Sequence, residues 1–290
     1  MPPARSFALA PVPSVLLAIG SVQGGAAIAK GLFPMLGAAG TVGLRIGISL
    51  LLLLAVVRPP LRRLQPAQWR AVVPYGVALG AMNLLFYCAL ARIPLGLAVT
   101  LEFVGPLAVA LAGSRRRLDV GWALVAGAGI VLLTPWTGQP LDALGVGFAL
   151  LAGGAWAAYI VLGSRVAAVL PGAQGVAIGM LFAALVVLPF SAATGGWSHL
   201  TPSLLAAGAL LAVLSSALPF TLEMNALQQL SSRTFSVLMS LEPAAAAICG
   251  LLFLHERLTL SQWLAVGLVV AASAGATLTG APGSVVTKSE

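Results

Sequence analysis

Residues 80–111 read GAMNLLFYCALARIPLGLAVTLEFVGPLAVAL and contain two apolar stretches separated by a short polar break at 92–94. A helix needs about 20 mostly apolar residues to cross the hydrocarbon core of a bilayer. Each stretch reaches that length when it is extended to its polar limits, at 70–91 and 95–113. This segment therefore predicts two membrane-spanning helices joined by a short loop.

The composition of the 290 residues indicates the same class for the whole chain. Hydrophobic types make up 60% of the residues and charged types only 8%, and the mean hydropathy is +1.04. Soluble domains carry roughly a quarter charged residues. This composition excludes a cytosolic globular enzyme, a disordered protein and a secreted disulfide scaffold, which leaves a polytopic membrane protein.

Similar apolar runs recur along the chain and predict ten membrane-spanning helices. The first run is too long for the core of a signal peptide, so we expect an uncleaved first helix. The connections are short, and the tail at 280–290 is predicted to be disordered. The expected spans are 13–34, 37–57, 70–91, 95–113, 118–135, 141–163, 172–193, 203–227, 233–254 and 259–279.

The positive charges predict how these spans are oriented. If the N-terminus and every second loop share one side, the opposite side carries only Arg92 and Arg257. Positively charged loops stay on the cytoplasmic side, so we expect both termini to be cytoplasmic. The residues on the cytoplasmic side are Arg5, Arg58, Arg62, Arg63, Arg70, Arg115, Arg116, Arg117, Arg165, Arg233 and Lys288.

Several other classes of function lack the residues that they need. Cys88 and Cys249 lie inside apolar runs, and His199 and His255 stand alone, so we expect no disulfide framework, no metal site and no cofactor. No GxxxxGK[ST] motif for ATP binding occurs. The net charge of +8 is spread in short clusters and does not form a nucleic-acid-binding face.

The two halves of the chain resemble each other. Residues 89–106 read ALARIPLGLAVTLEFVGP and residues 226–243 read ALQQLSSRTFSVLMSLEP, and these segments align without gaps. Five spans per half mean that the second copy enters the membrane from the opposite side, as in an inverted-topology repeat. The expected fold is all-α, with ten transmembrane helices in two inverted five-helix repeats at 13–135 and 141–279.

Four ionisable residues lie inside the expected spans: Lys30, Arg45, Glu102 and Glu242. Each costs ~2.5–3.5 kcal/mol on insertion scales, so each is a candidate functional residue. Lys30 either extends to the membrane interface or binds substrate. Arg45 either pairs with Glu102 or holds a substrate carboxylate, which its planar guanidinium matches.

Uncharged residues complete the candidate substrate site. Gln23 shares a helix face with Lys30, because the two are seven residues apart. Asn83 and Tyr87 lie one turn apart, and they either bind a ligand or tie helices together. The aromatic candidates, which either pack between helices or line a substrate site, are Trp156 and Tyr159.

Two prolines predict irregular backbone at membrane depth. Pro106 has no N–H and frees the carbonyl of Glu102, and Pro243 likewise frees that of Met239. Irregular backbone is tolerated in a membrane where it lines a cavity, so Glu102, Met239 and Glu242 are candidate site residues. Glu102 is the predicted proton-coupling residue, because an apolar cavity destabilises its ionised form and lets a proton compete with a substrate ammonium group.

Three segments resemble a known transporter family. They are SVQGGAAIAKGLFP at 21–34, the stretch at 80–111 quoted above, and LPFTLEMNALQQLSSRTFSVLMSLEPAAAAICGLLFL at 218–254. These are similar to the threonine/homoserine exporters of the EamA family, a branch of the drug/metabolite transporter superfamily. His255 departs from the family pattern, in which Gly often precedes the glutamate. The resemblance implies ten helices in two inverted repeats, a central cavity and efflux of small amino acids.

These observations lead to one expected function and several alternatives. We expect a secondary-active exporter of small hydrophilic amino acids in a bacterial inner membrane, coupled to protons and acting as a monomer or dimer. Arg45 or Lys30 would bind the substrate carboxylate, and Glu102 or Glu242 its ammonium group. The alternatives are another EamA cargo, such as an aromatic amino acid or a drug-like cation, transport in the uptake direction, and a membrane enzyme.

Overall fold

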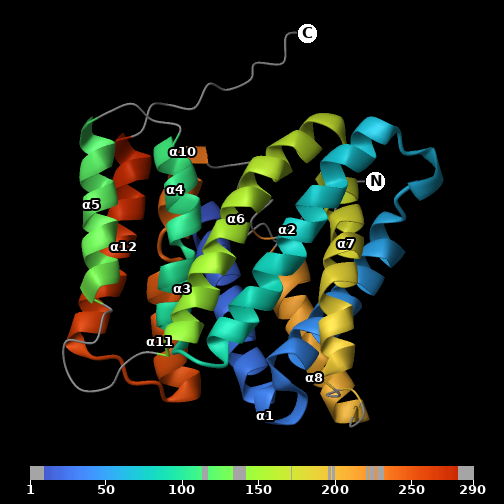
Figure 1. The fold of residues 1–290 in the computed structure, drawn as a ribbon, viewed down its shortest axis with the longest axis horizontal. Helices are drawn as coiled ribbons and strands as arrows, with labels where there is room; N and C mark the ends of the chain where they lie inside the picture. Colours follow the sequence, from blue (N-terminus) through green and yellow to red (C-terminus); the bar gives the residue numbers. More distant parts are fainter. Residues whose placement is uncertain are drawn as a thin grey trace.

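The structure is a computed structural model, and it describes residues 10–112, 117–132, 142–170, 172–194, 197, 200–219, 222, 226 and 232–279. Within these ranges every regular element is helical, and the helices form one bundle (Figure 1). The expected all-α class is therefore confirmed. The tail at 280–290, for which we predicted disorder, lies outside the described residues.

The helices follow the apolar runs of the sequence. Six helical stretches in the described part of the chain are long and apolar enough to cross a membrane, and shorter apolar helices accompany them. The elements are α1 (Pro11–Val57), η1 (Leu61–Arg63), α2 (Pro66–Leu90), α3 (Leu95–Glu102), α4 (Val104–Ala112), α5 (Arg117–Leu132), α6 (Ala143–Val169), α7 (Gly172–Ala193), α8 (Pro202–Ala212), η3 (Val213–Ala217), α10 (Ser232–Met239), α11 (Glu242–Leu254) and α12 (Leu260–Thr279).

The first two expected spans, 13–34 and 37–57, belong to the single element α1. The backbone turns at Gly37, whose φ of 66° and ψ of 169° are not helical. A residue with a Cβ atom rarely adopts this conformation, whereas glycine does so at little cost. Pro34 removes a helical N–H just before the turn. The two parts of α1 therefore run in opposite directions, and the turn lies at the lower end of Figure 1.

Two of the expected spans are interrupted. The span at 95–113 is divided into α3 and α4 at Phe103, and the span at 233–254 is divided into α10 and α11 at 240–241. Proline follows each interruption within three residues and removes a backbone donor there. Irregular backbone therefore occurs in both places at which the prolines predicted it.

Two further spans differ in detail from the sequence prediction. The span expected at 203–227 contains α8 and then η3, a five-residue stretch of π-helix, and most of 220–227 lies outside the described residues. The span expected at 141–163 continues to Val169 in α6. Single π-turns are rare and often lie at functional sites, and the apolar pattern alone does not reveal them.

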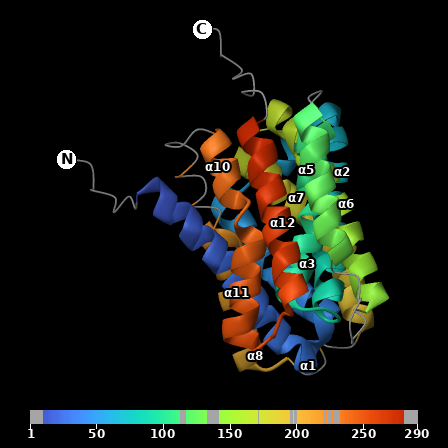
Figure 2. The same ribbon diagram turned by 90° about the vertical axis from the view of Figure 1, so that its left-hand side faces the viewer.

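Helices that are distant in the sequence lie side by side. α2 packs against α6 and α7, α3 packs against α11, and α5 packs against α12. The pair of α5 and α12 lies at the left edge of the bundle in Figure 1 and faces the viewer in Figure 2. Each half of the chain therefore contributes helices to a shared core.

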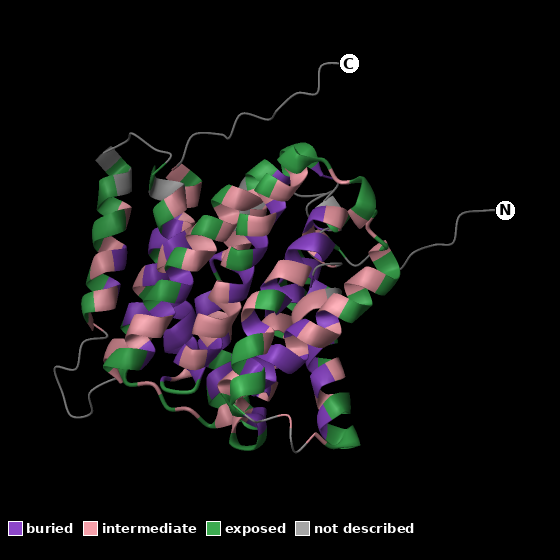
Figure 3. Ribbon diagram, turned by 45° about the vertical axis from the view of Figure 1, so that its right-hand side comes forward, coloured by how far each residue is buried: buried purple, intermediate pink, exposed green. Residues whose placement is uncertain are grey.

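The packing of this core depends on small residues. A Cβ atom at Gly76 or Gly80 of α2 would collide with the backbone of α7, and one at Gly96 of α3 would collide with Ala247 of α11. Small residues let membrane helices approach closely in this way. Figure 3 shows the buried residues concentrated on the central helices. Large apolar side chains such as Val56 and Phe253 are exposed on the outside, as a lipid-facing surface requires.

Candidate substrate-binding site

A guanidinium group is held against one face of α2 inside the bundle. Arg45, on the second part of α1, donates a hydrogen bond from Nη2 to Oδ1 of Asn83. Its Cζ atom lies 5.1 Å from the ring centroid of Tyr87, a cation–π distance. Asn83 Nδ2 donates to the carbonyl of Leu79 at 2.8 Å, which fixes the amide. Asn83 and Tyr87 are one helical turn apart, so together they orient the arginine side chain.

Two buried carboxylates lie in the same region. Glu102 is the last residue of α3 and Glu242 is the first residue of α11, and each is 7% exposed. Glu102 interacts electrostatically with both Glu242 and Arg45. The structure therefore brings together three of the four ionisable residues that the sequence places inside spans. Within the described residues, His, Cys, Asp and Glu form no group of three or more that could hold a metal ion.

Arg45 and Glu102 attract each other without forming a close ion pair. Their pairing is not among the salt bridges of 4.0 Å or less that the described part of the chain forms. The direct partners of the guanidinium are instead a neutral amide and an aromatic ring. Arg45 can therefore still form a bidentate contact with a carboxylate, the strongest type of hydrogen bond it makes.

Three buried polar atoms have no hydrogen-bond partner among the described residues. They are Oε1 of Gln23, Nε of Arg45 and the phenol oxygen of Tyr87. Leaving such a group unsatisfied costs about 1–3 kcal/mol, so each one requires an explanation such as water or a ligand. One atom is an acceptor, one is a donor, and the phenol can be either. Together they suit a small ligand that carries both donors and acceptors.

The candidate residues occupy two depths in the bundle. The upper and lower sides of the bundle differ, and one of them is the side where α2 joins α3. Measured from the helix ends on that side, three residues lie seven or eight residues deep: Arg45, Asn83 and Glu102. At 1.5 Å per residue this is about 11 Å along the helix axis. Gln23 and Glu242 lie 12 or 13 residues from the same side, or about 19 Å. The site is therefore buried well below either surface.

Lys30 lies apart from this cluster. Its Nζ donates to Oε1 of Glu256 at 2.6 Å and to the carbonyl of Ile93 at 2.8 Å. The side chain thus extends to the end of the bundle, where protein groups hold it. The sequence did not identify Glu256 as its partner. The sequence did contain a signal, because an ammonium group inside a span needs a compensating acceptor. Glu256 was a candidate acceptor, since its loop lies on the same side of the expected topology as the end of span 13–34.

The aromatic candidates have aromatic neighbours. Trp156 of α6 contacts Phe103 edge-on, with ring centroids 5.4 Å apart and an interplanar angle of 86°. Tyr159 stacks on Tyr75 of α2 with centroids 4.9 Å apart, and the two hydroxyl groups lie 3.3 Å apart. Trp156 therefore packs against the residue that separates α3 from α4, directly after Glu102, whereas Tyr159 packs against α2.

Met239 is the last residue of α10 and lies in an apolar environment. It packs in a small cluster around Val15 and Ile19, on the first turns of α1, with Phe235 beside it. The structure does not bring its side chain together with the Arg45 cluster. Its backbone nevertheless borders the interruption between α10 and α11, where the sequence predicted a freed carbonyl.

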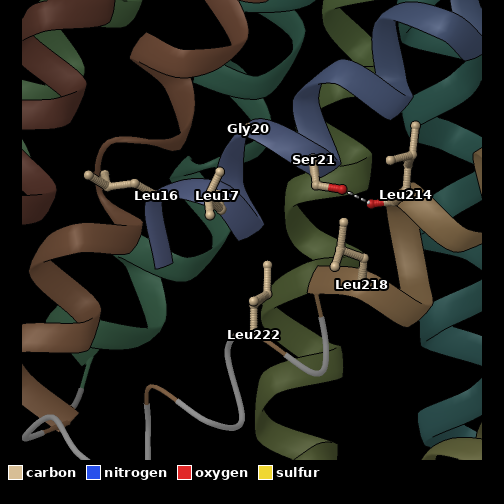
Figure 4. Close-up of a pocket in the computed structure, with 7 residues that line it drawn as sticks. All are labelled: Leu16, Leu17, Gly20, Ser21, Leu214, Leu218 and Leu222. Carbon is tan, nitrogen blue, oxygen red and sulfur yellow. Dashed lines mark hydrogen bonds between the residues drawn. The ribbon is translucent and has the colours of Figure 1, made fainter. Parts of the chain in front are cut away.

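A groove of about 340 Å³ separates the first part of α1 from η3, but its lining does not suit an amino acid. Figure 4 shows mostly leucine side chains around it. Ser21 contributes the one hydroxyl of the lining, and this hydroxyl donates to the carbonyl of Leu214 at 2.7 Å. An apolar groove offers no partner for either charge of a zwitterion, so the polar cluster is the better candidate. The lining residues are Leu16, Leu17, Gly20, Ser21, Leu214, Leu218 and Leu222.

Similarity to known proteins identifies the family of this chain. The EamA-like transporter family matches residues 143–278. The threonine/homoserine exporter RhtA of Escherichia coli (strain K12) is 47% identical over 272 residues, which cover 93% of this chain and 92% of that protein. This chain belongs to the EamA-like transporter family. RhtA of Salmonella typhimurium (strain LT2) is 46% identical over the same shares of each chain.

This EamA-like protein shares its overall fold with a solved structure. A crystal structure that is 19% identical in sequence aligns with a TM-score of 0.60, over 92% of this chain and 97% of the other. Family membership identifies the chain as a multi-pass membrane transporter and not an enzyme. The alternative of a membrane enzyme is thereby excluded.

Proposed function

We propose that this EamA-like transporter exports threonine, homoserine and related small hydrophilic amino acids, and that the Arg45 cluster binds them. Relatives that match 93% of the chain are named threonine/homoserine exporters. The observation that carries the proposal is a half-buried guanidinium whose buried Nε has no hydrogen-bond partner and which has no close carboxylate partner among the described residues, in a region that also holds Glu102 and Glu242. Such a region offers opposite charges to the two ends of a zwitterion.

Each end of the substrate has a complementary group in this site. Arg45 binds the carboxylate, because its Nε is unsatisfied and its fork geometry matches two carboxylate oxygens. Glu102 binds the ammonium group, and Glu242 supplies a second negative charge in the same region. The unsatisfied oxygens of Tyr87 and Gln23 form hydrogen bonds with polar atoms of the substrate. Lys30 does not enter the proposed site, since its ammonium group is engaged by Glu256 and Ile93.

The two glutamates suit different roles in proton coupling. Glu242 lies in the first turn of α11, where the helix dipole favours a negative charge. Glu102 is the last residue of α3, where the dipole disfavours one. Glu102 is therefore the carboxylate that exchanges a proton for the substrate ammonium group. Protonation on one side of the membrane then releases the substrate.

We also propose that the helices form ten spans in two inverted five-helix repeats, at 13–135 and 141–279. One observation in support concerns the interruptions. α3 ends at Glu102 and α10 ends at Met239, and the gap-free alignment of 89–106 with 226–243 pairs these two residues. Both interruptions thus fall at the same position of the repeat.

The pattern of helix contacts supports the same repeat. In the proposed repeat, α4 corresponds to α11 and α2 to α8, and the two parts of α1 correspond to α6 and α7. The contact of α4 with α6 therefore corresponds to that of α11 with α1, and the contact of α2 with α7 corresponds to that of α8 with α1. All four contacts occur. The contact of α5 with α12 maps onto itself, as expected on a pseudo-two-fold axis.

The charge distribution supports cytoplasmic termini in a bacterial inner membrane. Arg92 and Arg257 are the loop cations on the opposite side of the ten-span topology, and positive loops remain cytoplasmic. The end of the bundle where α2 joins α3 and α11 joins α12 is then the outer end. The Arg45 layer lies about 11 Å below it.

Counterflow in proteoliposomes tests this proposal. Vesicles containing purified protein and unlabelled threonine should accumulate labelled threonine and homoserine, and phenylalanine should compete poorly because the site is small and polar. Protein-free vesicles and Val56→Ala, a change at a side chain that is 81% exposed on the outside of α1, serve as controls. Counterflow of phenylalanine without that of threonine or homoserine would contradict the proposed substrate class.

A further inference from the structure

A mostly buried ion pair lies at the end of the bundle where α2 joins α3. Lys30 Nζ lies 2.6 Å from Oε1 of Glu256, and the side chains are only 22% and 14% exposed. The same ammonium group donates to the carbonyl of Ile93, in the loop between α2 and α3. The pair therefore ties the first part of α1 to the loop between α2 and α3 and to the segment after α11.

Glu256 also caps the N-terminus of α3. Its Oε2 accepts a hydrogen bond from the backbone N–H of Leu95 at 2.8 Å. The first N–H groups of a helix lack helical partners, and a carboxylate stabilises them. α3 follows Pro94, and its capping residue makes no side-chain cap of its own. Glu256, more than 150 residues away in sequence, thus supplies the cap.

The local backbone aims Glu256 inward. His255 adopts a left-handed conformation with φ of 54° and ends α11, and Glu256 N donates to the carbonyl of Gly250 at 3.1 Å. A Cβ atom on Gly250 would lie 2.6 Å from Oε2 of Glu256. The carboxylate therefore packs directly against the helix from which its own segment emerges. This placement brings it between α11 and α3.

A second ion pair at the same end lacks these features. Arg92 Nη1 and Asp142 Oδ2 are 2.8 Å apart, but the side chains are 41% and 36% exposed. Exposed pairs contribute little because water and salt screen them. By contrast, Ile93 directly beside Arg92 is only 2% exposed, and its carbonyl is held by Lys30. Of the two ion pairs, the one between Lys30 and Glu256 is therefore the less exposed to water.

We propose that Lys30 and Glu256 form the outer gate of the transport pathway, and that α3 connects this gate to Glu102. The proposal rests on the proposed function, in which the substrate leaves through the outer end. α3 has eight residues, with the Glu256-capped Leu95 at one end and Glu102 at the other. Opening the gate releases the N-terminus of α3, and the movement of this short helix displaces Glu102. Substrate release and carboxylate position are thereby coupled.

The rate at which a cysteine at Ile93 reacts with a maleimide tests the gate. Cys88→Ala and Cys249→Ala remove the native thiols, and Ile93→Cys supplies a reporter beneath the ion pair. In purified protein in detergent, Lys30→Met and Glu256→Gln should each raise the labelling rate at least tenfold. Glu256→Gln keeps an oxygen for the N–H of Leu95, so it isolates the loss of the ion pair from the loss of the cap.

The matched control removes a cation at the same end. Arg92→Met, next to the reporter, should leave the labelling rate within twofold of the parent. Equal acceleration by Arg92→Met and Lys30→Met, or no acceleration by Lys30→Met, would overturn the gate. The assay requires neither substrate nor membrane orientation, so its failure is distinguishable from failure of the proposed substrate or topology.

A cross-link provides a test that does not require the reporter or an unstable variant. Lys30→Cys combined with Glu256→Cys places thiols on both sides of the gate, and a short bifunctional thiol reagent then joins them. Compared with the same variant before treatment, the joined protein should lose counterflow activity, while the reagent should not change the activity of either single-cysteine variant. Full counterflow in the joined protein would overturn the proposal.

Discussion

At the scale of single residues, the distinctive feature is the environment of Arg45. Its Nε atom is buried without a hydrogen-bond partner, which costs about 1–3 kcal/mol, and the direct partners of the half-buried guanidinium are the neutral Asn83 and the ring of Tyr87. A protein that needed only a stable core would pair this charge with a close carboxylate. The arrangement is instead that of a binding group whose partner arrives with the substrate.

Replacing Arg45 and Glu102 separately and together tests this interpretation. Arg45→Met should weaken substrate binding by about 10- to 100-fold, the value of a lost hydrogen bond to a charged group. Arg45→Met combined with Glu102→Met should fold but remain inactive, because both substrate partners are missing. Counterflow normalised to the amount of purified protein is the measurement. Recovery of transport in the double variant would mean that the two residues form only a structural pair.

Glutamine substitutions separate the roles of Glu102 and Glu242. Glu102→Gln mimics the protonated carboxyl and should abolish substrate accumulation driven by an imposed pH gradient, with normal protein yield. Glu242→Gln removes a negative charge from the first turn of α11 and should chiefly lower the folded yield, since this charge favours the helix by about 0.3–1 kcal/mol. Full pH-driven accumulation by Glu102→Gln would refute its assignment as the coupling residue.

At the scale of helices, close approach of α6 holds the interruption next to Glu102. A Cβ atom at Gly153 would lie 2.7 Å from the carbonyl oxygen of Glu102, and one at Gly105 would collide with the carbonyl of Gly153. Pro106 removes the helical donor for the Glu102 carbonyl. Glycine at 153 therefore lets α6 pack directly against the freed carbonyl.

Adjacent glycines on α6 provide a matched pair of variants. Gly153→Ala should destabilise the protein by about 1–3 kcal/mol, as overpacking of a close contact does, and should lower transport by displacing Glu102. Gly154→Ala has no heavy atom within 4 Å of the new Cβ, so it should be neutral or stabilise the helix by up to about 1 kcal/mol. Thermal unfolding of the purified variants is the measurement. Equal melting temperatures for the two variants would contradict the close contact.

The sequence predicts the position of a helix well where hydrophobicity alone determines its limits. It predicts helices less well where backbone geometry determines how they begin, end or change type. Apolar runs predicted where α2, α7 and α12 lie, because a span needs a fixed apolar length. Pro106 and Pro243 also predicted irregular backbone in the right segments. The π-turn of η3 and the extension of α6 to Val169 were missed, since neither changes the apolar pattern.

At the scale of the whole molecule, the sequence predicts the charged residues of the candidate site but not their partners. A charge inside a span is visible in the sequence because it is costly, so Arg45, Glu102 and Glu242 were all identified. Their partners were not predictable, because residues such as Asn83 and Glu256 come from helices and loops whose packing the sequence does not specify. For Lys30 the sequence left open whether it extends to the interface or binds substrate, and the structure pairs it with Glu256 at the end of the bundle.

Reporter fusions test the proposed arrangement of the molecule in the membrane. Fusions at residue 64 and at the C-terminus should report a cytoplasmic location, and a fusion at residue 196 should report a periplasmic one. The physical reason is the concentration of Lys and Arg in every second loop. A cytoplasmic signal at 196 would contradict the ten-span topology while leaving the Arg45 cluster unaffected.

The central claim is that one buried site binds both charges of an amino acid, and ligand binding to the purified protein tests it most directly. Isothermal titration calorimetry compares homoserine with 3-aminopropan-1-ol, which lacks the carboxylate, and with 4-hydroxybutyrate, which lacks the ammonium group. Homoserine should bind at least about tenfold more tightly than either analogue, since each loses a charged hydrogen bond. In Arg45→Met the affinity for homoserine should fall to that for 3-aminopropan-1-ol. An undiminished preference for homoserine in Arg45→Met would contradict the account.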